Sequence, residues 1–121
     1  MSVHPEVGRR CAPKKLTNTT KTDCYVVGTT DEFDYAEIES IIIADSTGAV
    51  NTAVTINVTL ASVEYVIAAG LPVETTYPRF VAMQSFPLYR GDKISVTGAN
   101  GHHVFVVYVP LVGGGAQAQR L

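Results

Sequence analysis

The segment from residue 53 to residue 60, AVTINVTL, alternates apolar and polar side chains without a break. Its aliphatic members alternate with hydroxyl and amide side chains, in the order Val54, Thr55, Ile56, Asn57, Val58, Thr59 and Leu60. Because successive side chains of an extended backbone point to opposite faces, this period of two predicts a half-buried β-strand. One face would pack in a core, and the hydroxyl-rich face would meet water or a partner.

Further short strands are predicted on both sides of this segment, at residues 24–28, 38–44, 62–68, 80–86, 93–97 and 104–109. Gly, Pro and Asn-Gly separate them, as turns require. The run Ile41-Ile42-Ile43 predicts a strand that is buried on both faces or nearly so. Seven or so short strands with almost no helix predict an all-β fold, namely a single antiparallel β-sandwich that is jelly-roll-like.

A chain of 121 residues with 46% apolar residues is long enough for one domain and too short for two. The basic residues are concentrated near the start, whereas the charged residues between positions 25 and 90 are mostly acidic. We therefore expect an extended basic N-terminal arm at residues 1–22, the sandwich at 23–111 and a flexible Gly-rich C-terminal tail at 112–121. The arm either docks on a neighbouring copy or another protein, or is a solvated tail. The C-terminal segment is alternatively an ordered strap against a neighbour.

Charge and hydropathy argue against several partner classes. The net charge of −2 gives no reason to expect nucleic-acid or membrane binding. The first ten residues lack the apolar run of a secretory signal, and no apolar stretch is long enough to cross a bilayer, so we expect a soluble, unexported chain.

Cys11 and Cys24 are interpreted as ordinary thiols, because two cysteines make neither a disulfide framework nor a four-ligand zinc site. A bond between them would only join the arm to the first strand.

No pattern of a catalytic or metal site is evident. His102 and His103 are adjacent, so on a strand they point to opposite faces, and we interpret them as surface histidines beside a hairpin turn at residues 99–101. An acidic cluster lies between residues 31 and 39, and is a solvated turn, a protein-docking patch or a calcium site without the usual loop spacing: Asp31, Glu32, Asp34, Glu37 and Glu39. No nucleophile elbow or phosphate loop is present. We expect a chain that is not an enzyme, with no cofactor and no metal.

The segment at residues 87–96, PLYRGDKISV, places a Gly-Asp turn immediately before a strand. Gly91 suits a turn geometry that other residues resist, and Asp92 can bond back to the turn. Together with the strands at 38–45, 54–60 and 104–108, this order of elements resembles the small β-sandwich structural proteins of tailed bacteriophages. The resemblance covers about residues 24–110.

Such proteins decorate phage heads, form spike bases or sit at head-to-tail and tail positions, and they have no catalytic residues. The resemblance implies a virion protein assembled in the host cytoplasm, and we expect a decoration or cement protein on the outside of the head. Its partners would be the major capsid protein or other virion proteins, and further copies of itself, with a trimer favoured. Two alternatives stay open. One is a connector or tail-associated protein, and the other is a carbohydrate- or receptor-binding jelly roll, which the absence of Trp argues against.

Candidate partner-binding residues are the basic side chains of the arm and aromatic side chains that meet a subunit interface: Arg9, Arg10, Lys14, Lys15, Tyr77, Phe80, Phe86 and Tyr89. The alternative for each aromatic residue is packing in the core or on a sheet. We expect deletion of residues 1–20 to leave a folded domain that no longer binds particles.

Overall fold

The computed structural model describes residues 8–28, 35–48, 53–74 and 77–111, except for the side chains of residues 82 and 83. In this part of the chain the backbone forms eight strands, and no helix is present that is long and apolar enough to cross a membrane. The strands are β1 (Arg10–Lys15), β2 (Thr22–Val26), β3 (Tyr35–Asp45), β4 (Val54–Leu60), β5 (Val63–Leu71), β6 (Arg79–Tyr89), β7 (Lys93–Thr97) and β8 (His102–Leu111).

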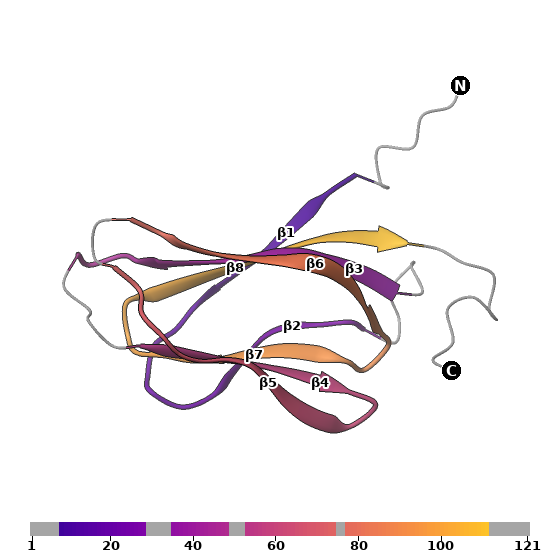
Figure 1. Cartoon of the computed structure of the whole chain (residues 1–121), viewed down its shortest axis with the longest axis horizontal. Helices are drawn as coiled ribbons and strands as arrows, with labels where there is room; N and C mark the ends of the chain where they lie inside the picture. The colour runs from indigo at the N-terminus through magenta and orange to yellow at the C-terminus, as the bar shows by residue number, and fades with distance from the viewer. Residues whose placement is uncertain (1–7, 29–34, 49–52, 75–76, 112–121) are drawn as a thin grey trace.

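The strands form two four-stranded antiparallel sheets that pack face to face (Figure 1). The first sheet has the order β1-β8-β3-β6 and the second has the order β2-β7-β4-β5. Every connection except the β4–β5 hairpin passes from one sheet to the other. This confirms the predicted all-β sandwich, and the strand order is that of an eight-stranded jelly roll.

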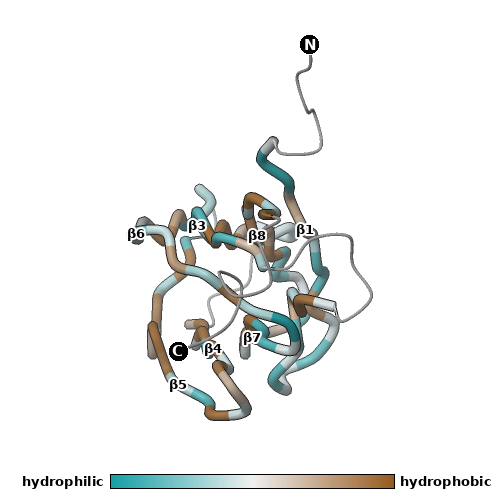
Figure 2. The backbone as a smooth tube through the Cα atoms, turned by 90° about the vertical axis from the view of Figure 1, so that its right-hand side faces the viewer, coloured by the Kyte–Doolittle hydropathy of each residue, from teal (hydrophilic) through white to brown (hydrophobic). Residues whose placement is uncertain are grey.

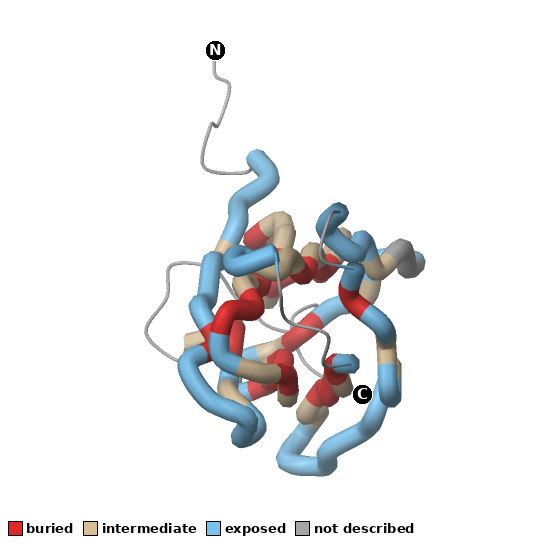
Figure 3. Tube along the Cα trace, turned by 90° about the vertical axis from the view of Figure 1, so that its left-hand side faces the viewer, coloured by how far each residue is buried: buried red, intermediate tan, exposed pale blue. Residues whose placement is uncertain are grey.

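The core lies between the two sheets, where the buried stretches of the chain meet (Figure 3). Ile38, Ile41 and Ile43 of β3 face Ile56 of β4 and Ile94 of β7 across it, and all five are fully buried. Burial of each such side chain contributes roughly 1.5–3 kcal/mol relative to exposure. The alternating segment at residues 54–60 is confirmed as a strand whose aliphatic face supplies this core.

The structure differs from the expected arm. Residues 10–15 are not an irregular arm but the edge strand β1, paired with β8 from Arg10 opposite Tyr108 to Lys15 opposite His103. Pro and Lys gave this segment the composition of an arm, yet the same residues are common on edge strands, where they discourage pairing with other chains. A deletion of residues 1–20 would therefore remove a strand of the sandwich together with the arm. The tail expected at residues 112–121 lies outside the described residues.

Candidate interaction surfaces

The outer face of the first sheet carries an unbroken apolar row. Pro13 lies opposite Phe105, Phe105 opposite Ile42, and Ile42 opposite Phe80, so the row crosses all four strands. The residues on either side of Ile42 are buried in the core, which places this row on the outside of the sheet. Phe80 is 61% exposed. We call Pro13, Ile42, Phe80, Phe105 and Val107 the apolar face.

The apolar face follows from two strands whose sequences do not alternate. Residues 41–44 of β3 read IIIA, and residues 104–107 of β8 read VFVV. Runs of this kind are typical of strands that are covered on both faces. In the structure, the side of Ile41 and Ile43 is fully buried, and Ile42 is only half-buried on the other side. No residue of β3 is exposed, so the prediction holds fully for the inner face and only in part for the outer face, where the side chains are half-buried.

The outer face of the second sheet is polar and internally bonded. Asp23, Ser95 and Asn57 are opposite one another on β2, β7 and β4. The Ser95 hydroxyl donates to Oδ1 of Asp23 at 2.8 Å, and Lys93 Nζ lies 3.2 Å from Oδ2 of Asp23. The Ser95 hydrogen bond lowers the pKa of Asp23, with burial opposing it and Lys93 adding to it. Ser95 and Asn57 are nevertheless buried, and the exposed Val26 lies beside them opposite Lys93. The centre of this face is therefore polar and bonded within the chain, unlike the apolar row of the first sheet.

The candidate basic residues do not gather into one patch. Arg9 pairs with Glu39 of β3 at 3.2 Å within the same chain. On β1, Lys15 lies opposite His103 beside the apolar face, whereas Arg10 and Lys14 occupy alternate positions that point to the other side of the sheet. Lys14 and Lys15 are exposed at this edge of the sandwich. The sequence reveals their charge, and the pleat of β1 decides that they diverge.

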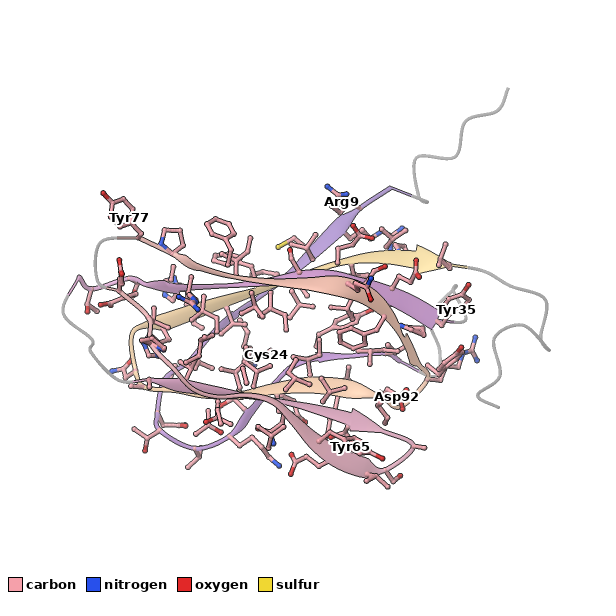
Figure 4. The ribbon with its side chains drawn as sticks, viewed as in Figure 1. Arg9, Cys24, Tyr35, Tyr65, Tyr77 and Asp92 are labelled. Atoms are coloured by element: carbon pink, nitrogen blue, oxygen red, sulfur yellow. The ribbon has the colours of Figure 1, made fainter. Side chains whose placement is uncertain are left out.

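The four candidate aromatic residues are also separated by the fold. Tyr77, which precedes β6, and Phe80, near the start of β6, are both exposed, and Figure 4 shows Tyr77 at one end of the first sheet. Phe86 is partly buried against the core, and Tyr89 stacks on Tyr35 with ring centroids 5.5 Å apart. The structure thus adds only Phe80 to the apolar face. Phe86 packs against the core, whereas Tyr89 packs on Tyr35 on the outer face of the first sheet, because the preceding Leu88 is the buried position. Packing in the core or on a sheet is the alternative that the sequence left open.

Sequence reasoning missed a second apolar surface, on β5. Figure 2 shows β5 as a mainly hydrophobic strand at the margin of the sandwich. Four of its large side chains are between 44% and 58% exposed: Val63, Tyr65, Val66 and Ile67. The sequence predicts a strand at residues 62–68, and only the end position of β5 in its sheet shows that its apolar side chains are uncovered. The sequence contains no signal for strand order.

The histidine prediction was partly wrong. His102 is fully buried, not a surface residue, because it is the first inward-facing position of β8. Its Nδ1 accepts a hydrogen bond from the Ala99 backbone N–H at 3.1 Å, within the expected turn. His103 is half-buried on the opposite face.

Among the described residues no group of three or more His, Cys, Asp or Glu side chains is placed to hold a metal ion. Of the acidic cluster, Glu37 and Glu39 lie on β3, and residues 31–34 fall outside the described residues.

Both cysteines are free thiols. Cys24 lies between the sheets (Figure 4), and burial raises its pKa to about 11. Cys11 is exposed on β1. Because a thiolate is the reactive form of cysteine, the buried thiol is chemically inert at neutral pH.

No protein-family model matches the chain, and no curated protein matches it. The apolar face and β5 are therefore the features on which a functional proposal rests.

Proposed function

We propose that the protein is a virion structural protein that decorates the outside of a phage head as a homo-oligomer, with its apolar face seated on the capsid. The observation that carries the proposal is the row from Pro13 through Phe105 and Ile42 to Phe80. A contiguous exposed apolar surface is typical of a protein–protein contact. The jelly roll is a fold that viral capsid proteins use, and the resemblance to small phage β-sandwich proteins points the same way.

The mechanism is mechanical. A rigid sandwich that contacts more than one capsid subunit binds the assembled shell better than its separated parts, so it stabilises the shell by mass action. The apolar face supplies contact area with Phe80 as an exposed aromatic anchor, a residue type enriched at interfaces. Lys15 lies beside this face and favours an acidic rim on the partner. The described sandwich is held by its own core, so the face is presented without a folding step.

The location is tested by quantitative mass spectrometry of purified particles from the source of the protein. A copy number near that of the major capsid protein supports decoration of the whole shell. A far lower copy number, on the scale of a single ring, would overturn decoration in favour of a connector or tail position. Complete absence from particles would overturn the virion proposal as a whole.

The binding face is tested with two matched variants in a particle-binding assay. Phe80→Glu places a charge in the apolar face, and Val26→Glu places the same charge on an exposed apolar residue of the second sheet, opposite Lys93. We expect Phe80→Glu to reduce particle binding by about tenfold or more, because burying an unpaired charge at an interface is costly. Val26→Glu should bind as the unmodified chain does. Equal binding by both variants would show that the apolar face does not contact the particle.

A further inference from the structure

The first part of strand β5, residues 63–67, is exposed on both of its faces. Val63 and Tyr65 lie opposite Leu60 and Val58 of β4, so they point to the core side of the second sheet. Val58 is buried, yet Val63 and Tyr65 are each 51% exposed. On the outer side Val66 is 58% exposed. The first sheet therefore does not cover residues 63–67 of β5, whereas Ala68 and Leu71 farther along the strand pack against the core. The sandwich is open at the 63–67 part of this edge.

The other edge strands of the two sheets carry features that discourage pairing with another chain. Strand β1 contains Pro13 and three basic residues, and β6 contains Pro87 and begins at Arg79. Strand β2 is interrupted by a register shift between Asp23 and Tyr25. Strand β5 contains no Pro, and although its ladder with β4 shifts twice beyond Val66, residues 63–66 pair with β4 without a shift. The free side of this stretch is a regular template for one more strand.

The charge of β5 fits a second copy of the same strand. Glu64 is its single charged residue, and its carboxylate pairs with Lys21, which precedes β2 in the same chain. An isologous contact brings like residues near one another, so a strand with three cations such as β1 repels its copy. The paired Glu64 avoids this repulsion. A neutral, apolar edge is self-complementary.

We propose that two copies of the chain associate through β5, which pairs antiparallel with β5 of the partner to make one continuous eight-stranded sheet. The uncovered core sides of the two strands then adjoin, and Val63 and Tyr65 of both copies become part of one extended core. The pairing is two-fold and closes at two copies, whereas the resemblance favours a trimer. This proposal deepens the proposed function and rests on it only for the biological role of the oligomer, since the contact is tested on the purified chain alone.

The test combines analytical ultracentrifugation with hydrogen–deuterium exchange of the full chain over a range of concentrations. We expect a dimer, and slower exchange of the β5 backbone amides as the dimer forms, with no change in β1. Monomers at every concentration, a trimer, or a dimer whose β5 amides exchange as in the monomer would overturn the proposal.

Two variants make the test specific. Val66→Lys places like charges at the proposed contact and should weaken association by about tenfold or more. Val66 is exposed in the single chain, so at a concentration where both proteins are monomers the urea midpoint of the variant should stay near that of the unmodified protein. This measurement separates loss of association from loss of folding. Phe80→Lys is the matched control on the apolar face and should leave the dimer intact. Dimers that survive Val66→Lys but not Phe80→Lys would overturn the assignment to β5. Absence of the protein from particles would instead contradict the proposed function and leave the β5 contact standing.

Discussion

The carboxylate of Asp92 accepts a hydrogen bond from the backbone N–H of Ala61, with Oδ1 3.0 Å from the nitrogen. Its Oδ2 accepts a second bond from the backbone N–H of Tyr89 at 2.9 Å. Asp92 is only 2% exposed, and Figure 4 places it at the end of the sandwich where the β4–β5 and β6–β7 turns meet. One buried side chain thus joins the hairpin that presents β5 to the turn between the two sheets.

Replacement of Asp92 should be strongly destabilising. Asp92→Ala leaves two backbone N–H groups without their acceptor, and we expect a loss of about 2–3 kcal/mol in the free energy of unfolding. Asp92→Asn keeps one acceptor oxygen and should lose less. Urea unfolding measures both, with Glu74→Gln at an exposed carboxylate as the control, for which we expect a change within about 0.5 kcal/mol. A change of that small size in Asp92→Ala would contradict the proposed link between the turns.

The turn between β4 and β5 carries backbone strain. The φ angles of Ala61 and Ser62 are 50° and 69°, values that residues other than Gly rarely adopt. Ala61→Gly keeps the N–H that Asp92 accepts and removes the strain, so we expect a gain of about 1 kcal/mol. Ala69→Gly, in β5 and without a positive φ, is the matched control and should lose stability. Thermal unfolding compares the two, and a loss in both would show that the turn is unstrained.

Acidification should destabilise the fold through His102. Burial lowers its pKa below the usual 6.5, and the nearby Asp45 opposes this effect only in part. The unfolded chain, whose histidine keeps the usual pKa of 6.5, therefore binds the proton more readily than the folded chain. The free energy of unfolding is unaffected above pH 6.5 and decreases as the pH falls below 6.5, by at most about 1.4 kcal/mol per pH unit. Protonation would also end the acceptor role of Nδ1 toward Ala99.

Urea unfolding between about pH 7.5 and about pH 5 measures this dependence. His102→Gln cannot take up the proton and should flatten the profile, and His103→Gln should retain it. A profile that is equally steep in His102→Gln would assign the pH dependence to other groups.

Thiol labelling should distinguish the two cysteines. A maleimide at neutral pH is expected to modify Cys11 in the native chain and to leave Cys24 unmodified, because burial raises the Cys24 pKa to about 11 and excludes the reagent. Intact mass spectrometry should show one adduct in native protein and two after denaturation. Cys11→Ser should show none in the native state, and rapid labelling of that variant would mean that the sheets open at Cys24.

Parts of the fold follow directly from local sequence. The alternation of Val54 to Leu60 identifies β4 and its buried face, and the Gly91-Asp92 pair identifies the turn before β7. Both depend on neighbours in the chain. The hydrogen bond that Asp92 accepts from Ala61 joins residues 31 positions apart, and no local pattern indicates it.

The candidate surfaces show the same division. The exposed Phe80 was predicted as a contact residue, but its neighbours Ile42 and Phe105 were not, because they come from strands that only the sheet order makes adjacent. The burial of His102 and the pairing of Arg9 with Glu39 likewise depend on strand register.

The sequence alone therefore determined the class of fold, most strand positions and the turns, because the period of side chains and the backbone preferences of Gly, Pro and Asp act over a few residues. The tertiary structure decided which strands lie at the edges, which apolar residues stay exposed and which polar residues are buried. These properties depend on pairing between distant segments. Valine shows this directly, because Val58 of β4 is buried in the core whereas Val63 of β5, an edge strand, is 51% exposed.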